Sequence, residues 1–435
     1  MGVFFVGCDI FKGKDDDPKL DEQLEAALVD ASNGQGMDYF RLPESTDFNA
    51  IPQDPRNPIT AKKVELGQLL YHETALNINA VKAEGMGTES CASCHHAAAG
   101  FQAGRIQGIG EGGWGFGQKG EARTQNPNYD VTELDIQPIR TPSAMNGAYQ
   151  EAQLWNGQFG ALGINAGTQA FWTPGTPKAD NSFGYEGLEI QAIAGLKVHR
   201  MGDVDQSIAT THARYTQLFA EAFPGQPIDR EHAGLAIAAF ERTLMANQSP
   251  FQKWLRGTKD AMTEQEKRGA ILFFDKANCA ACHTGPALNS MTFYALGMEN
   301  LNGPGVYGDP SVDASRFGRG SFTGNAADNY KFKTPQIYNL MDSPFYGHGG
   351  TFKSVREVVE YKNAAIPSNS EVPESQLAAE FVPLNLTADE MTDLTAFIEG
   401  ALYDPDLFRY VPNSVPSGNC LPANDSQTRA DLNCN

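Results

Sequence analysis

The sequence predicts an all-α fold built from two related domains with long loops. Apolar residues recur at helical spacing in several segments, and no set of alternating strands occurs. A module of similar motifs is present twice along the chain. The 44 glycines and 25 prolines fall largely between the helical segments, so long connecting loops are expected.

Composition and charge narrow the class of protein. The chain has 435 residues, of which 41% are hydrophobic and 10% aromatic, as in a soluble globular protein of two or three domains. It carries 53 acidic and 33 basic residues, a net charge of −20, which opposes binding to a phosphate backbone. No apolar run is long enough to predict a membrane-spanning helix. Nucleic acid is therefore not an expected partner.

The periodicity places helices along the chain in order. We expect them at residues 61–72, 215–223, 231–255, 264–274, 355–361 and 388–402. Thr-x-x-Glu capping boxes begin two of them, at Thr263 and Thr387. Residues 9–60 are rich in Asp, Pro, Asn and Gly and predict an extended leader over the first domain, with one amphipathic stretch at residues 20–31.

The pattern C-x-x-C-H occurs twice, as Cys91, Cys94 and His95 and again as Cys279, Cys282 and His283. Two thiols one helical turn apart can form thioether bonds with the two vinyl groups of one haem, while the adjacent imidazole binds the iron. The sequence therefore predicts two covalently bound c-type haems. The alternative is a zinc site, for which the two cysteine pairs would have to converge and both histidines would be incidental.

Both C-x-x-C-H motifs lie inside a repeated module. Its parts are Gly67-x-x-Leu70-Tyr71 and Arg140-Thr-Pro-x-x-x-Asn146 around the first motif, and Gly269-x-x-Leu272-Phe273 and Lys333-Thr-Pro-x-x-x-Asn339 around the second. Arg140 lies 49 residues after Cys91, and Lys333 lies 54 residues after Cys279. The repeat predicts four segments: a leader at 1–58, a first haem domain at 59–257, a second haem domain at 258–411 and a tail at 412–435. We expect each haem domain to be cytochrome c-like.

The other cysteines indicate an oxidising compartment, which agrees with attachment of c-type haem outside the bacterial cytoplasm. Cys420 and Cys434 close a polar loop with few apolar residues, so a disulfide between them is expected. Cys8 follows Phe-Phe-Val-Gly, which is similar to a lipoprotein cleavage box; the alternative is a lone cysteine in a frayed segment. The expected location is the periplasm or the cell surface.

A glycine run follows the first C-x-x-C-H motif. Gly108, Gly110 and Gly113 match the dinucleotide-binding pattern G-x-G-x-x-G, but no strand precedes them. We interpret this run as a flexible loop beside a haem face.

The first haem module also contains Leu154-Trp155-Asn-Gly157, and the second contains Pro344-Phe-Tyr-Gly-His348. The two haem modules resemble the bacterial di-haem cytochrome c peroxidase and MauG family over residues 59–407. The resemblance implies that the N-terminal haem reacts with hydrogen peroxide and that the C-terminal haem holds or delivers electrons. It also implies that Trp155 lies between the haems and relays electrons; the alternative role of Trp155 is packing.

The resemblance also assigns residues to the first haem. His95 is its proximal ligand, and no histidine occurs between His96 and His199, so this haem is expected to be five-coordinate, as in the MauG branch. Gln191 matches a distal glutamine of the family, whereas Arg200 stands at the position of a family glutamate. His199 and Arg200 form a chemically sensible pair, one taking the peroxide proton and the other stabilising the leaving oxygen. Alternatively, Arg200 pairs with a haem propionate and His199 is structural.

For the second haem, the resemblance gives His283 as the proximal ligand and a sixth ligand from the helix after Phe352. The family uses Met or Tyr there, and Tyr361 is our predicted ligand; the alternatives are Lys362, Met341, or a packing role for Tyr361.

Family members hold calcium between the domains through an Asn at the position where this chain has Arg140. Calcium is therefore doubtful, and an ion pair between Arg140 and Asp342 could replace it.

The expected function is a di-haem peroxidase-like oxidoreductase that reduces hydrogen peroxide with electrons from a small cytochrome or copper protein. A MauG-like enzyme that oxidises Trp or Tyr side chains of a dedicated partner protein is the alternative, and the missing axial Met and distal His shift weight toward this branch. A passive electron-transfer cytochrome is the remaining alternative, and it requires a sixth ligand on the first iron.

Overall fold

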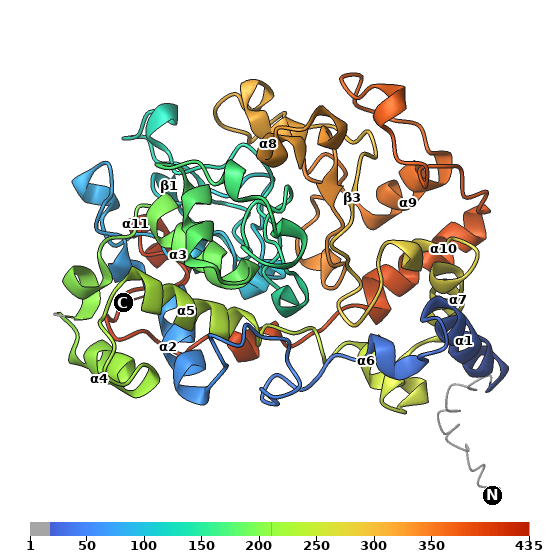
Figure 1. Ribbon diagram of the computed structural model, residues 1–435, viewed down its shortest axis with the longest axis horizontal. Coiled ribbons are helices and arrows are strands. Elements are labelled where there is room, and N and C mark those ends of the chain that lie inside the picture. Colours follow the sequence, from blue (N-terminus) through green and yellow to red (C-terminus); the bar gives the residue numbers. More distant parts are fainter. Residues whose placement is uncertain (1–17, 210, 435) are drawn as a thin grey trace, which may run out of the picture.

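The computed structural model describes residues 18–209 and 211–434, which form a mainly helical protein with long irregular connections (Figure 1). Cys8 lies outside the described residues, so its predicted lipid anchor stays a prediction. Among the described residues, no helix is both long enough and apolar enough to cross a bilayer.

The helices are, in chain order, α1 (Pro18–Ala31), α2 (Ala61–His72), α3 (Gly187–Val198), α4 (Ala213–Ala222), α5 (Arg230–Glu241), α6 (Pro250–Leu255), α7 (Glu264–Phe274), α8 (Gly320–Thr323), α9 (Val355–Ala364), α10 (Ala388–Ala396) and α11 (Ser426–Asp431). Two antiparallel pairs of very short strands accompany them, β1 (Gly113–Trp114) with β2 (Thr124–Gln125) and β3 (Phe293–Tyr294) with β4 (Phe332–Lys333). In register, Gly113 faces Gln125 and Phe293 faces Lys333. The predicted mostly helical fold is confirmed.

The helices pack in two groups, one beside each C-x-x-C-H motif. Helices α2, α3, α4 and α5 form the first group, and α1, α7, α9 and α10 form the second. The repeated glycine has the same role in both. A Cβ on Gly67 of α2 would lie 1.9 Å from the Ala236 carbonyl oxygen of α5, and one on Gly269 of α7 would lie 1.9 Å from that of Asp393 on α10. Only glycine permits these close helix crossings.

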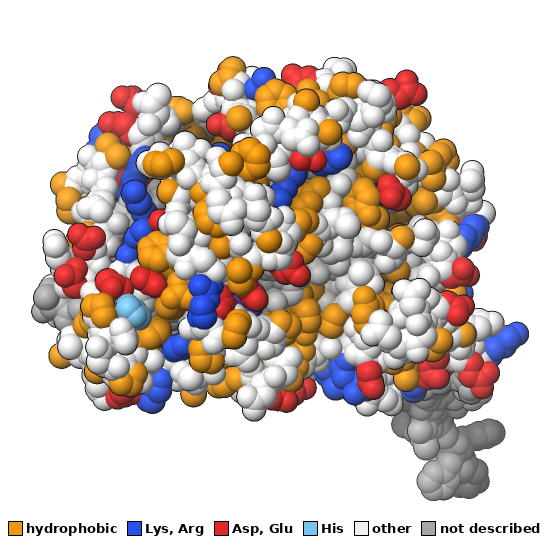
Figure 2. Space-filling model, in the orientation of Figure 1, with side chains coloured by type: hydrophobic (Ala, Val, Ile, Leu, Met, Phe, Trp, Pro, Cys, Tyr) orange, Lys and Arg blue, Asp and Glu red, His pale blue; other side chains and the backbone are white. Residues whose placement is uncertain are grey.

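One apolar core runs through both groups. It includes Leu66, Leu70, Ile193 and Phe240 beside the first motif and Phe273, Phe274, Leu394 and Phe397 beside the second. On the face shown in Figure 2, acidic and basic side chains are interspersed among apolar ones.

Two predicted helices differ from the structure, and a further helix was not predicted. The predicted helix 231–255 is two helices, because the chain turns after Glu241 and α6 restarts at Pro250, where the Ser249 side chain caps it. The predicted helix 388–402 ends as α10 at Ala396 and continues as one π-helical turn. Helix α3 was not predicted, because its apolar residues are buried all round and leave no polar stripe. Both predicted capping boxes are present.

The predicted position of the leader over the first domain is wrong for residues 18–31, which contain the predicted amphipathic stretch 20–31. They form α1, which packs on α7 of the second group (Figure 1). The Asp21 carboxylate accepts a hydrogen bond of 2.6 Å from Trp254 Nε1 and lies 2.9 Å from Lys267 Nζ. These buried polar contacts fix the amphipathic stretch to the second group.

The C-terminal tail returns to the first half of the chain, where α11 packs against β1 (Figure 1). The predicted disulfide joins Cys420 to Cys434 with their Cα atoms 5.7 Å apart. Asp425 forms a buried ion pair of 3.1 Å with Arg123, which also donates to the Ile109 and Gly110 carbonyls. The tail thereby holds the glycine-rich loop that follows the first motif.

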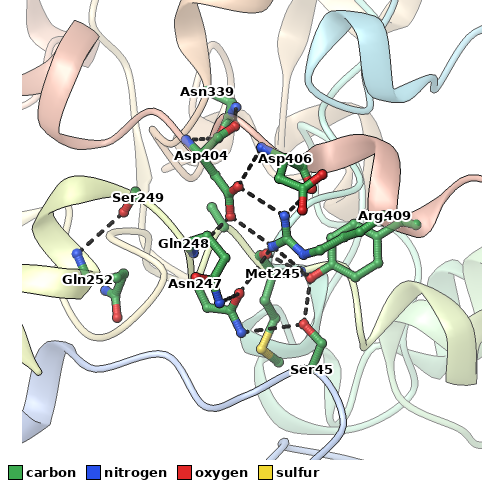
Figure 3. A network of polar contacts seen from close by, with 12 residues as sticks. Ser45, Met245, Asn247, Gln248, Ser249, Gln252, Asn339, Asp404, Asp406 and Arg409 are labelled. Atoms are coloured by element: carbon green, nitrogen blue, oxygen red, sulfur yellow. Dashed lines mark hydrogen bonds and ion pairs between the residues drawn. The ribbon is translucent and has the colours of Figure 1, made fainter.

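A polar network joins the segment after α10 to the connection between α5 and α6 (Figure 3). The Arg409 guanidinium lies 2.8 Å from the Asp404 carboxylate and donates a bond of 2.8 Å to the Met245 carbonyl. Asp404 accepts from the Gln248 backbone at 2.9 Å, and its carbonyl accepts from Asn339 Nδ2 at 2.8 Å. The network ties the two helix groups together.

Candidate active site

The second C-x-x-C-H motif lines a cavity of about 570 Å³ with a largely apolar wall. Cys279, Cys282 and His283 all face this cavity. His283 Nδ1 lies 3.1 Å from the Leu288 and Pro335 carbonyl oxygens, which can only accept, so Nδ1 carries the proton. Burial lowers the pKa of His283 to about 4, so the ring is neutral and Nε2 is free to bind iron. The donors and the space fit a c-type haem.

The first motif, beside α2, repeats the hydrogen bonding of the histidine. His95 Nδ1 lies 3.3 Å from the Phe101 carbonyl oxygen, and Tyr71 donates a bond of 2.8 Å to the His95 carbonyl. Burial lowers the pKa of His95 to about 4, which again leaves a neutral imidazole. Cys91 packs near α2 and Cys279 near α7, so the convergence that a shared zinc site needs does not occur.

His199 directly follows α3 and lies close enough to His95 for its charge to lower the pKa of that residue. Its Nδ1 is 2.8 Å from Asp135 Oδ2. A carboxylate accepts, so Nδ1 holds the proton and Nε2 is the basic nitrogen. Burial works to lower the pKa of His199, but the Asp135 carboxylate outweighs it and the pKa is raised above its usual value. The structure therefore provides an oriented imidazole near the first motif.

Arg200 is turned toward other partners. Its backbone has a left-handed φ of 56°, and its guanidinium lies 2.6 Å from Glu111 Oε2 and 2.8 Å from the Glu133 carbonyl oxygen. Arg200 and His199 are neighbours in sequence, but they bind different acids. Gln191 lies on α3 beside Gly195, and among the described residues it makes no hydrogen bond to His199 or Arg200.

The glycine-rich loop packs against the first motif, as its position predicted, and close approach explains its glycines. A Cβ on Gly108 would lie 3.0 Å from Cys94 Sγ. A Cβ on Gly110 would lie 2.0 Å from Glu89 Oε2 and 2.5 Å from Asp135 Oδ2. Two carboxyl groups thus meet over Gly110. Burial and the negative charge of Asp135 raise the pKa of Glu89 well above its usual range.

Trp155 lies where the two modules meet. Its Nε1 donates a bond of 2.8 Å to the Arg140 carbonyl of the first module, and its own carbonyl accepts one of 2.8 Å from the Lys333 backbone of the second. Its ring lines the cavity of the second motif, 6.3 Å from the ring of His348. The sequence repeat therefore brackets this indole from both sides.

The predicted ion pair between Arg140 and Asp342 is wrong. The buried Arg140 guanidinium donates to Ser343 Oγ at 2.7 Å, to the Arg105 carbonyl at 2.7 Å and to Gln102 Oε1 at 2.9 Å. Asp342 instead lies 3.9 Å from Lys119 Nζ. Neutral oxygen atoms thus accept the hydrogen bonds of the guanidinium. Burial lowers the pKa of Arg140 to about 9.

Three residues were considered as sixth ligand of the second haem, and the structure brings one of them to the cavity. Lys362 lines it, whereas Tyr361 does not. The Tyr361 hydroxyl donates a bond of 2.6 Å to the Leu296 carbonyl, and its ring packs on Phe352 and Phe381. Met341 is 49% exposed at the surface.

Sequence reasoning missed the acids around His199. Asp135 reaches the site because its carbonyl accepts a bond of 2.8 Å from the Gly110 backbone and Ile109 pairs with Ile136. No local spacing in the sequence predicts the pairing of Ile109 with Ile136. Glu89 stands two residues before Cys91, and that proximity was the available signal.

Comparison with known proteins identifies the family. Residues 61–260 match the family model described as di-haem cytochrome c peroxidase. The methylamine utilization protein MauG of Methylorubrum extorquens is 30% identical over 84% of each chain. The cytochrome c551 peroxidase of Pseudomonas aeruginosa is 26% identical over 86% of each chain.

Solved structures give the same result. A MauG-like protein associated with microbial copper homeostasis superposes with a TM-score of 0.60 and 25% identity, over 84% of this chain and 95% of its own. The chain therefore belongs to the di-haem cytochrome c peroxidase and MauG family of oxidoreductases, which bind two c-type haems.

Proposed function

We propose that this protein reduces hydrogen peroxide at the haem of the first motif, with electrons drawn from a protein through the haem of the second. The observation that carries the proposal is the His199–Asp135 pair near His95. Bound haem supplies the iron at which peroxide is reduced. The chain supplies the groups that move protons and electrons to that point.

Proton transfer follows from the hydrogen bonds. Reduction of hydrogen peroxide to water consumes two protons and two electrons. His199 Nε2 accepts a proton from peroxide while Asp135 holds the ring and stabilises the imidazolium that forms. Glu89, which meets Asp135 over Gly110, holds a further proton in reserve at the same place. Arg200 neutralises Glu111 and so limits the negative charge beside this pair.

Electron transfer follows from the position of Trp155. Its indole is hydrogen-bonded to a residue of the first module and lines the cavity of the second, so it offers an aromatic relay between them. We assign it that role. The electron source is then a protein that docks outside the second cavity, and attachment of c-type haem implies the periplasm or the cell surface.

A second candidate is oxidation of Trp or Tyr side chains on a dedicated partner protein. Two relatives favour it, the 30% identical MauG and the 25% identical MauG-like structure. The electrons for peroxide reduction would then come from those side chains. Both candidates use the same peroxide site and differ only in the donor.

One experiment tests the shared part and then separates the donors. The holoprotein is mixed with hydrogen peroxide and a co-purifying or genomically neighbouring partner, and haem absorption is followed by stopped flow. Peroxide-dependent oxidation of a metal centre on the partner supports the first candidate. A permanent mass change on a partner Trp or Tyr supports the second. Failure of the holoprotein to react with peroxide contradicts both.

A further inference from the structure

We infer that Lys362 Nζ is the sixth ligand of the iron bound by His283, so that the second haem has a His–Lys ligand pair. This deepens the proposed function and rests on it, because it names the group that closes the second haem to peroxide and leaves that reaction to the first. The inference replaces Tyr361 with its neighbour.

Helix geometry selects Lys362. The residues of α9 that line the cavity are Val355, Val358, Val359 and Lys362. The last three of these residues follow Val355 by three, four and seven positions, so all four lie on one face of the helix. Tyr361 lies off this face, with its hydroxyl bound to the Leu296 carbonyl. Recruiting Tyr361 would require breaking that bond and rotating the helix.

The lysine has no other described role. In the described part of the chain its amine makes no ion pair or hydrogen bond, and Nζ lies 5.7 Å from the centroid of the Phe381 ring. Val358, Val359 and Phe381 give the cavity an apolar wall around it. Lys362 is half-buried, and an amine that faces an apolar wall is stabilised by a partner there, because a charge held away from water is costly. The iron is the partner that the site offers.

Met298 and His348 are competing donors, since they also line the cavity. The His348 ring stacks on Phe332, and its Nε2 lies 3.3 Å from Asn300 Oδ1. The Met298 sulfur packs against Gly347, where an added Cβ would lie 3.2 Å from Sδ. Met298 belongs to the loop after β3, whereas Lys362 extends from α9, the helix whose valines line the same cavity. Met298 and Lys362 give different spectra, so the choice between them can be tested.

The coordination step is balanced. The ammonium of Lys362 releases one proton to solvent, and the neutral amine donates its lone pair to iron without any change in oxidation state. A nitrogen donor produces low-spin iron with a lower reduction potential than a thioether does. The second haem would then hold an oxidised state more readily than one with an axial Met.

The test uses the full-length holoprotein with both haems. Near-infrared magnetic circular dichroism of the oxidised wild type should show the charge-transfer band of amine-ligated low-spin haem. Lys362→Ala should convert the low-spin haem to high spin, and Lys362→Met should replace the amine band with a thioether band and raise the potential. Tyr361→Phe and Met298→Leu are the matched controls and should leave the band unchanged.

A phenolate band in the wild type that Tyr361→Phe abolishes would overturn the inference, and so would a thioether band that Met298→Leu abolishes. The wild-type spectrum decides even if a variant fails to fold. Peroxide reactivity of the same samples separates the two proposals: an amine band in a protein inert to peroxide sinks the proposed function and leaves the ligand standing.

Discussion

His199 Nδ1 and Asp135 Oδ2 lie 2.8 Å apart, although 64 residues separate them in sequence. The bond joins the end of α3 to the segment that pairs with the glycine-rich loop. It fixes the imidazole tautomer and leaves Nε2 as a base near the first haem motif. An acid–imidazole pair of this kind orients a base and stabilises its protonated form.

His199→Ala should slow the reaction with peroxide by about 100-fold or more, because it removes the group that accepts the first proton. Both haems should stay attached. Stopped-flow rates measure the effect, and Arg200→Ala and Gln191→Ala report on the other two distal candidates. His232→Ala is the matched control, since His232 forms a similar 2.8 Å pair with Asp229 away from the site. If Gln191→Ala is slow and His199→Ala is not, the assignment of the base is wrong.

Asp135→Asn should move the acid limb of the pH–rate profile to lower pH. The Asp135 carboxylate raises the pKa of His199, and an amide cannot, so burial would then lower that pKa. The rate falls as pH decreases through the pKa, because protonated His199 cannot accept a proton. The measurement is the peroxide rate constant across pH for wild type and variant. An acid limb that stays in place would show that Asp135 does not control the base.

Trp155→Phe should preserve the peroxide reaction at the first haem and slow the spectral change of the second. A phenyl group is much harder to oxidise than an indole and cannot donate to the Arg140 carbonyl, as Trp155 Nε1 does. Trp172→Phe is the matched control, because Trp172 bonds locally to Thr168. If the second haem of the Trp155 variant still changes its spectrum at the wild-type rate, Trp155 has only a packing role.

Turnover with a protein donor should fall as ionic strength rises. The net charge of −20 favours a partner with a basic docking patch, and salt screens such an encounter. Opposite charges are interspersed on the face shown in Figure 2, so net charge carries the expectation here. Steady-state rates over a salt series provide the measurement. Salt-insensitive turnover of small phenols, faster than any protein donor supports, would contradict the assigned substrate class.

Local signals in the sequence predicted much of this architecture. The two capping boxes act over a few residues and are present as predicted. The repeated glycines lie at the same kind of close helix crossing in both groups. The break before Pro250 and the helix α3 were missed, because tertiary packing overrides periodicity there.

The chemistry around the haems depended on longer-range contacts. Asp135 contacts His199 only because the glycine-rich loop pairs with residues 135–136. Arg140 donates hydrogen bonds to Ser343 and to carbonyl oxygens instead of pairing with Asp342. Tyr361 and Lys362 differ by one position on α9, and only the orientation of the helix against the cavity separates them. Sequence spacing does not contain that rotation.

The central claim is that one haem is open to peroxide and the other is closed. Electron paramagnetic resonance of the fully oxidised holoprotein tests it most directly. The account predicts one high-spin ferric signal, from the haem that His95 binds, and one low-spin signal, from the haem that His283 binds. Two low-spin signals without high-spin iron would contradict it, because His199 or another residue would then ligate the first iron and the protein would be a passive electron carrier.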